Sequence, residues 1–358
     1  MQRNTRWCVL GVTLALLLGD MTPSAQDREF EPVTDAMLQD PSPDDWLMWR
    51  RTLDSWGYSP LDQITRDNVD DLQMVWSRAM TEGRQQGTPL VYDGVMYMPN
   101  PGDVIQAIDA VTGDLAWEHR REVPDDIEDY VFNNLWQNNR NVAIYDNLII
   151  DTSVDDHVFA LDATTGEMVW ETEILDYATN RAMQSSGPII ANGKVISGRS
   201  CRKPDSCVIT AHDARTGAEL WRRRTIPAPG EPGDETWGDV AFEDRQHVGA
   251  WMVPSYDPAL NLIYIGTSVT SPAPKFMLGG TDLAHLYHNS TLALDADTGE
   301  IVWYYQHLKD HWDLDHPFER ILVDTAVAPH PAAVSWINPR LQAGETRRVI
   351  TGIPGKTG

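Results

Sequence analysis

The sequence predicts an all-β protein of the β-propeller type, from one repeated motif, its spacing and the tryptophan that ends each copy. The motif Asp-Ala-x-Thr-Gly-x-x-x-Trp occurs four times, beginning at Asp109, Asp162, Asp213 and Asp295. The first three copies follow one another at roughly 50 residues, which is the length of a four-stranded propeller blade rather than of a helical repeat. We therefore expect one blade for each copy.

The residue types within the motif indicate a tight β-hairpin. In the second copy, apolar runs at residues 158–161 and 168–170 flank the turn. The aspartate can bond to its own backbone two residues on, and the glycine accepts the left-handed conformation that closes such a turn. The tryptophan offers a large face for packing between neighbouring blades. Unrelated hairpins with a common turn would not place tryptophan at the same offset four times.

The segments outside the repeats complete the prediction of a single propeller domain over residues 26–358. Before the first repeat, residues 45–76 form a lead-in that we expect to end in a strand. Residues 227–238 and 271–289 are rich in proline and glycine, which predicts long surface loops that shape a binding site. After the last repeat, residues 348–351 begin a further blade, and we expect the chain to be an N-terminal part of a larger ring.

The N-terminal sequence is typical of a secretory signal peptide. Arg3 and Arg6 precede an apolar run at residues 7–19, and small residues follow up to Ala25. We expect cleavage after Ala25 and no membrane span in the mature chain, because the apolar run is too short to cross a bilayer comfortably and none follows it. Export to the periplasm is the predicted localisation.

The charge balance excludes one class of partner and favours another. The chain has 28 Lys plus Arg against 53 Asp plus Glu, a formal net charge of -25. Such a charge repels nucleic acid and anionic membrane surfaces. It would attract a basic patch on a small electron carrier, although an acidic excess is more often only a solubility feature.

The cysteine content predicts one structural disulfide. Cys8 leaves with the signal peptide, so the mature chain keeps Cys201 and Cys207. Two thiols in an oxidising compartment usually pair, and closing this short loop would stabilise the protein by about 2 kcal/mol. The spacing without a nearby histidine does not match a zinc site.

The chain from about residue 45 to residue 358 resembles the quinoprotein alcohol dehydrogenases, eight-bladed propellers that hold pyrroloquinoline quinone (PQQ) on their axis. The resemblance lies in the repeats and in four further segments, residues 58–61 (Tyr-Ser-Pro-Leu), 86–90 (Gln-Gly-Thr-Pro-Leu), 256–262 and 311–313 (His-Trp-Asp). It implies that about half to five-eighths of an eight-bladed ring is present. Within the family, the chain is most similar to the branch that acts on bulky or polymeric alcohols, such as polyvinyl alcohol dehydrogenase.

The resemblance implies a set of cofactor-binding residues. PQQ is a flat, polyanionic ortho-quinone, which needs an aromatic floor and cations for its carboxylates and quinone oxygens. Trp251 matches the floor, Arg140 the carboxylate-binding arginine and Lys356 the cation beside the quinone oxygens. Thr152 matches a hydroxyl contact, and Gln86 stands where a glutamate contact is common. The structural alternatives are a core tryptophan, a surface arginine and a threonine that only favours its strand.

Asp313 matches the catalytic aspartate of the family, which would take the alcohol proton while hydride passes to PQQ. His311, Asp315 and His316 surround it in the sequence, so a structural cluster or a separate metal site is the alternative.

The metal ligands of the family are matched only in part. Calcium is usually held by a glutamate, an asparagine and the catalytic aspartate. Here Val269 stands at the asparagine position, and residues 199–207 contain no glutamate. The remaining metal ligands are Asp313 and Asp205, which could take the place of the missing glutamate. The adjacent cysteine pair of the family is also missing from residues 133–140, and Cys201 and Cys207 would instead stiffen a loop near the same site.

Three functions follow from the sequence. The first is PQQ-dependent oxidation of an alcohol to an aldehyde or ketone, with electrons passed to a soluble cytochrome c. The second is a non-catalytic propeller scaffold, like the outer-membrane assembly lipoproteins, although no lipid-attachment cysteine follows Ala25. The third is an inactive, truncated dehydrogenase.

Overall fold

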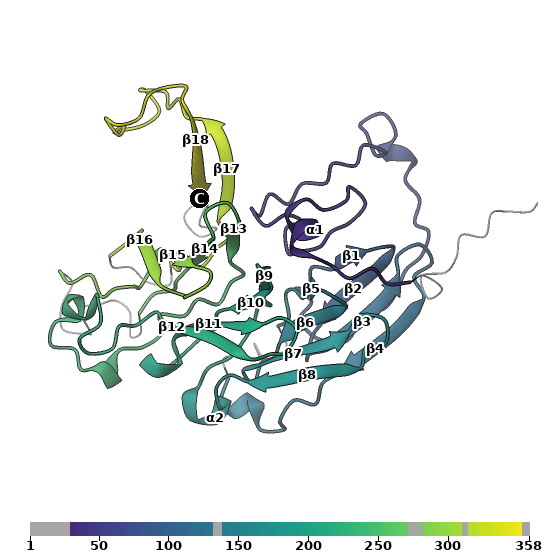
Figure 1. Ribbon diagram of the computed structural model, residues 1–358, viewed down its shortest axis with the longest axis horizontal. Helices are drawn as coiled ribbons and strands as arrows, with labels where there is room; N and C mark the ends of the chain where they lie inside the picture. Colours follow the sequence, from purple (N-terminus) through teal and green to yellow (C-terminus); the bar gives the residue numbers. More distant parts are fainter. Residues whose placement is uncertain (1–28, 132–137, 271–276, 278–281, 310–313, 353–358) are drawn as a thin grey trace, which may run out of the picture.

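The protein consists of four four-stranded antiparallel sheets followed by a two-stranded sheet, which confirms the predicted all-β propeller. The computed structural model describes residues 29–131, 138–270, 277, 282–309 and 314–352. Within each four-stranded sheet the strands are neighbours in chain order, and the sheets follow one another around a common centre (Figure 1). The predicted signal peptide, residues 1–25, lies outside the described residues.

The strands are three to six residues long, and each sheet is a series of hairpins. The first two sheets contain β1 (Leu90–Tyr92), β2 (Val95–Asn100), β3 (Val104–Asp109), β4 (Leu115–Arg120), β5 (Ala143–Tyr145), β6 (Leu148–Thr152), β7 (His157–Asp162) and β8 (Met168–Glu173). The next two contain β9 (Ile189–Ala191), β10 (Lys194–Ser197), β11 (Val208–Asp213), β12 (Glu219–Arg224), β13 (Ser255–Asp257), β14 (Leu262–Gly266), β15 (Ser290–Asp295) and β16 (Ile301–Gln306). The last sheet pairs β17 (Ile321–Ala326) with β18 (Thr346–Thr351), and the helices α1 (Asp35–Gln39) and α2 (Tyr177–Asn180) are short.

Each repeat forms the turn between the last two strands of its sheet. In the first copy, one carboxylate oxygen of Asp109 accepts the backbone N–H groups of Val111 and Thr112, each at 2.9 Å. Gly113 follows with a φ of 77°, where a residue with a side chain would be strained. The antiparallel register shifts beside this turn, between Ala107 and Ile108. The hairpin predicted from the aspartate and the glycine is thus confirmed.

The tryptophans of the first three repeats each join their sheet to the next one. The indole of Trp117 in β4 packs on Gly166 of the second sheet, where a Cβ would lie 2.6 Å from the ring. Its N–H donates to the carbonyl of Ala163 in the same turn, at 3.0 Å. The same ring-on-glycine contact recurs at Trp76 on Gly113, Trp170 on Gly217 and Trp221 on Gly299. The tryptophan is therefore the inter-blade contact that the sequence predicted.

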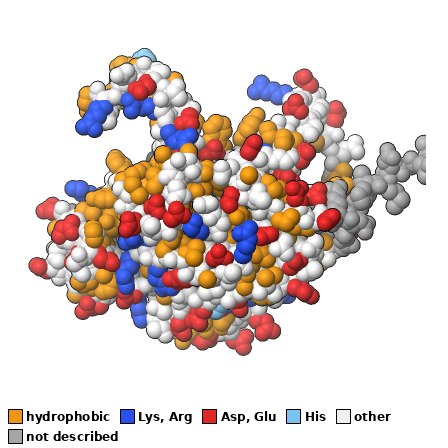
Figure 2. Space-filling view, in the orientation of Figure 1, with side chains coloured by type: hydrophobic (Ala, Val, Ile, Leu, Met, Phe, Trp, Pro, Cys, Tyr) orange, Lys and Arg blue, Asp and Glu red, His pale blue; other side chains and the backbone are white. Residues whose placement is uncertain are grey.

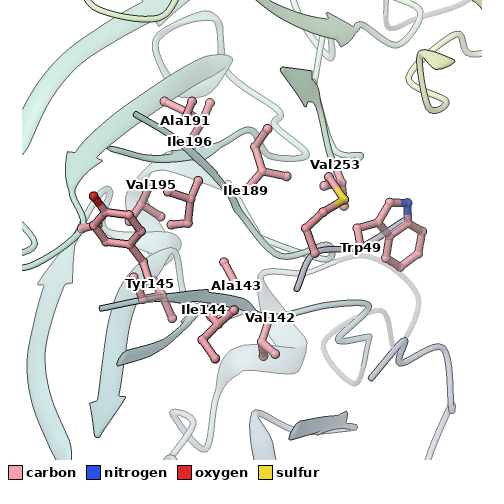
Figure 3. Close-up of a cluster of buried hydrophobic side chains, with 14 of the residues drawn as sticks. Trp49, Val142, Ala143, Ile144, Tyr145, Ile189, Ala191, Val195, Ile196 and Val253 are labelled. Carbon is pink, nitrogen blue, oxygen red and sulfur yellow. The ribbon is translucent and has the colours of Figure 1, made fainter. Parts of the chain in front are cut away.

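Apolar strands at the centre form the core between the sheets. Residues of β5 and of β9 and β10 face one another there, together with Trp49 and Val253 (Figure 3). All three residues of β5 and all three of β9 are buried. Strands that are covered on both faces have continuous apolar sequences, and these two match that pattern.

The lead-in and the residues just before it connect the sheets to one another. Together they form backbone hydrogen bonds to four different sheets, and the pairs are Trp46 with Val91, Val33 with Asp146, Leu53 with Tyr256 and Asp54 with Leu322. The carboxylate of Asp35 reaches the third sheet, where it accepts the N–H of Gly193 at 3.0 Å. The predicted strand at the end of the lead-in is absent from the described residues, since residues 72–80 pair with no strand. Trp76 makes its docking contact without it.

Within the residues that the structure describes, no helix has both the length and the apolar character needed to cross a membrane.

Replacing Trp117 with alanine should destabilise the protein by about 3–5 kcal/mol, because the change removes a large buried ring and the hydrogen bond to Ala163. Urea unfolding measures the free-energy difference. Val111→Ala, at a residue that is 74% exposed in the neighbouring turn, is the control and should change stability by less than about 0.5 kcal/mol. Equal stabilities of the two variants would contradict the inter-blade role of Trp117.

Candidate functional site

Three of the predicted cofactor-binding residues, Arg140, Thr152 and Trp251, lie at one end of the sheets. Because neighbouring strands are antiparallel, the loop before the innermost strand and the loop after the second strand lie at the same end of a sheet. Arg140 precedes β5 and Thr152 ends β6, both in the second sheet. Trp251 precedes β13 in the fourth sheet. The fold therefore brings these residues from different sheets to one place.

Arg140 and Trp251 are in direct contact. The guanidinium carbon of Arg140 lies 5.5 Å from the centre of the Trp251 ring, within the range of a cation–π interaction. One guanidinium N–H donates to the carbonyl of Ser185. Loss of hydration lowers the pKa of Arg140 to about 10. The cation is partly buried, and in the described part of the chain no carboxylate forms an ion pair with it.

A chain of hydrogen bonds connects Thr152 to Trp251 across three sheets. The buried hydroxyl of Thr152 donates to the carbonyl of Ser186 at 3.3 Å. The hydroxyl of Ser186 donates to the carbonyl of Trp251 at 2.6 Å. Thr152 therefore belongs to the same cluster as Trp251, which its strand propensity alone would not indicate.

Asp315 holds the other side of Trp251. The indole N–H donates to one carboxylate oxygen of Asp315 at 3.2 Å, and the backbone N–H of Val269 donates to the other at 3.3 Å. The sequence indicated Asp315 only as a neighbour of Asp313. Its role as acceptor for the indole was missed, because nothing local in the sequence connects residue 315 with residue 251.

Gln86 lies at the edge of this cluster. Its side chain is exposed, and two residues later the N–H of Thr88 donates to the carbonyl of Arg140 at 2.8 Å. Between them, a Cβ at Gly87 would lie 2.3 Å from the carbonyl oxygen of Pro99, so only glycine allows this close approach. The segment before β1 is thus fixed against the backbone of Arg140.

Comparison with known proteins identifies the family to which this arrangement belongs. The family model for the PQQ glucose/ethanol/alcohol dehydrogenase β-propeller domain matches residues 46–335. The chain belongs to the PQQ-dependent alcohol dehydrogenase family.

Relatives and solved structures agree with this family. The dehydrogenase subunit of the quinone alcohol dehydrogenase of Komagataeibacter europaeus is 32% identical over 96% of this chain and 47% of that protein. Quinohemoprotein alcohol dehydrogenase ADH-IIG of Pseudomonas putida is 33% identical over 84% of this chain and 44% of that protein. The solved ADHIIG structure from Pseudomonas putida HK5 has a TM-score of 0.77 at 30% identity, covering 89% of this chain and 46% of the other. The chain therefore spans about half the length of these relatives.

The described residues of this family member fit PQQ, and among them no cluster would hold a metal ion by itself. The partly buried Arg140 over Trp251 fits a flat anion. Across the ranges that the structure describes, no three His, Cys, Asp or Glu side chains are grouped to hold a metal. Asp205 is exposed and pairs with Arg224 at 3.2 Å. Asp313 and Lys356 lie outside the described residues, so their predicted roles are not tested.

The predicted disulfide is present in this dehydrogenase-family chain. Cys201 and Cys207 are bonded, and both side chains are fully buried. They pack with Ile226, Trp237 and Val248 in a small apolar cluster. The segment of Val248 leads directly to Trp251.

Two buried carboxyl groups, Asp151 and Asp103, lie near the end of β6 in the second sheet. Asp151 accepts hydrogen bonds from the side chain of Asn139 at 2.5 Å and from the N–H of Thr152 at 2.7 Å, and burial raises its pKa well above its usual range. Burial also raises the pKa of Asp103 to about 7, although Arg121 opposes this shift. The sequence did not indicate either residue, because a buried aspartate has no local signature.

Asp103 should make the stability of the protein depend on pH. An unfolded chain loses this proton near pH 4, whereas the folded protein keeps it up to about pH 7. The unfolded state thus binds fewer protons in this window, and the free energy of unfolding decreases as the pH rises through it. Asp103→Asn should lose less stability than the wild type between about pH 4 and about pH 7 in urea titrations. The exposed Asp125→Asn is the control, and an unchanged pH profile in Asp103→Asn would contradict the assignment.

Proposed function

We propose that this chain binds PQQ at the Arg140–Trp251 cluster and contributes to the oxidation of an alcohol to an aldehyde or ketone. The observation that supports binding most strongly is the guanidinium of Arg140, which lies 5.5 Å above the Trp251 ring and has no carboxylate partner in the described ranges. An anionic, flat ligand would supply the missing countercharge and a surface for the indole. PQQ has both properties.

Different residues of the chain would bind the cofactor, position the indole and transfer the proton. Arg140 would bind a carboxylate of the cofactor, and Thr152 would offer a hydroxyl contact. Asp315 positions the indole of Trp251 through its 3.2 Å hydrogen bond. When bound, PQQ supplies the quinone that accepts a hydride from the alcohol carbon. Asp313 would take the alcohol proton as general base, with Lys356 as a further cation.

We further propose a periplasmic enzyme that passes its electrons to a soluble cytochrome c. The predicted signal peptide and the buried disulfide support an oxidising compartment. The net charge of -25 favours a basic acceptor, and acidic side chains are spread widely over the face seen in Figure 2. The preference for bulky or polymeric alcohols, and a calcium ion held partly by Asp313, belong to the same proposal.

Arg140→Gln should weaken PQQ binding by at least about 30-fold, because a desolvated charge pair contributes about 2 kcal/mol or more. Quenching of tryptophan fluorescence by added PQQ measures the dissociation constant. The control is Arg120→Gln, at an exposed arginine whose partner is Glu118, and it should bind like the wild type. If PQQ failed to bind the wild-type chain, the proposed function would be wrong.

Asp313→Asn should separate binding from chemistry. The amide has the same shape but cannot accept the alcohol proton, so dye-linked alcohol oxidation should fall by about 100-fold or more while PQQ affinity changes little. Assays with PQQ, Ca²⁺ and alcohols of increasing size measure the rate of alcohol oxidation and the affinity for PQQ. Unchanged turnover in Asp313→Asn would exclude its role as base, and a wild-type chain that binds PQQ without turnover would favour the inactive dehydrogenase.

A further inference from the structure

We propose that the Cys201–Cys207 disulfide positions Trp251, and that it thereby sets the affinity of the site for PQQ. The proposal rests on the proposed function. It differs from a general stabilising role because both ends of the disulfide loop are connected to the few residues that immediately precede Trp251. Those residues, 247–251, belong to no helix or strand.

The first connection runs from the Cys201 end of the loop. The N–H of Ala250 donates to the carbonyl of Arg199 at 3.0 Å. The two backbones are so close that a Cβ at Gly198 would lie 2.0 Å from the carbonyl oxygen of Ala250. A Cβ at Gly249 would lie 2.7 Å from the carbonyl oxygen of Arg199. The chain at the Cys201 end of the loop is therefore packed directly against the residues before Trp251.

The second connection runs from the Cys207 end through Thr225. The N–H of Thr225 donates to the carbonyl of Cys207 at 2.9 Å. The buried Thr225 hydroxyl lies within hydrogen-bond distance of two carbonyl oxygens, that of Cys207 and that of Val248. The hydroxyl has one proton for these two acceptors, so it bridges the loop and the segment of Trp251 at a single point.

The disulfide closes these two connections into one ring. The strands on either side of the loop, β10 and β11, pair up to Ser197 and Thr210, and the S–S bond extends this closure to residues 201 and 207. Without the S–S bond, residues 201–207 would be closed only by the strand pairing below them, and each end carries one side of the support for residues 248–250. Ser268 also contacts this segment, because its N–H donates to the carbonyl of Gly249 at 2.8 Å. The Ser268 hydroxyl also accepts the N–H of Gly249 at 2.9 Å and donates to the carbonyl of His247 at 2.6 Å. Ser268 thus supports the segment from the fourth sheet, and the disulfide loop supports it from the third.

The main test compares the wild-type chain with the double variant Cys201→Ser/Cys207→Ser. We expect the affinity for PQQ to fall by about tenfold or more. In the variant, the Trp251 ring would have to be ordered when PQQ binds, and this ordering costs free energy. We also expect faster hydrogen exchange in the peptide that covers residues 247–252, with little change in the second sheet. Gly217→Ala is the matched control, because it disturbs the turn of the third sheet against Trp170 and leaves the disulfide intact. It should reduce stability and leave the PQQ affinity unchanged.

Two outcomes would overturn the proposal. One is a double variant with wild-type PQQ affinity and wild-type exchange at residues 247–252. The other is a Gly217→Ala variant that loses as much PQQ affinity as the double variant, which would show a general effect of stability. If the wild-type chain does not bind PQQ, the proposed function fails, while the exchange measurement still decides whether the disulfide positions Trp251.

A second pair of variants applies if the double cysteine variant does not fold. Thr225→Val removes the hydroxyl that bridges Cys207 and Val248 but keeps the disulfide and a side chain of similar shape. It should increase exchange at residues 247–252 and weaken PQQ binding, whereas Thr225→Ser, which keeps the hydroxyl, should restore both. Equal behaviour of the valine and serine variants would contradict the bridge.

Discussion

The packing of a tryptophan on the turn glycine of the next sheet is the constraint that sets the order and spacing of the four-stranded sheets. The ring of Trp117 covers Gly166, and Trp221 covers Gly299 in the same way. A Cβ at either glycine would collide with the ring, so the distance between adjacent sheets is fixed at these turns. The inner strands meet through a separate set of contacts, the apolar side chains of β5, β9 and β10, and the loops before β5, β9, β13 and β17 lie at one end of the sheets.

At that end, each sheet supplies a polar group to the next one. Thr152 donates to Ser186, Ser186 donates to Trp251, and the indole of Trp251 donates to Asp315. These hydrogen bonds cross from the second sheet to the loop before β17, and none belongs to a strand ladder. Arg140 lies beside this chain of bonds and is bonded to the carbonyl of Ser185. A carbonyl oxygen offsets only part of the free-energy cost of removing a guanidinium from water. The cluster therefore favours the binding of an anion.

The parts of the fold that the sequence predicted correctly are those whose cause is local. The turn at Asp109 needs only its own aspartate and glycine, and the disulfide needs only two cysteines in an oxidising compartment. The missed features depend on distant neighbours. Asp35 reaches Gly193 of the third sheet, and Asp315 meets Trp251. No spacing within the sequence indicates such a pair. The prediction of a strand at Trp76 was wrong for the same reason, because a strand needs a partner strand that the local sequence does not specify.

The structure also separates two requirements of the proposed chemistry. The orientation of Arg140, Thr152 and Trp251 depends on contacts among the second, third and fourth sheets, all of which lie within the described residues. In the proposed reaction, proton transfer would depend in addition on Asp313, and charge stabilisation on Lys356, at positions that the structure does not describe. Affinity for PQQ and turnover of an alcohol are therefore expected to respond to different substitutions. A change in the disulfide loop would act on affinity through Trp251, whereas a change at Asp313 would act on the reaction alone.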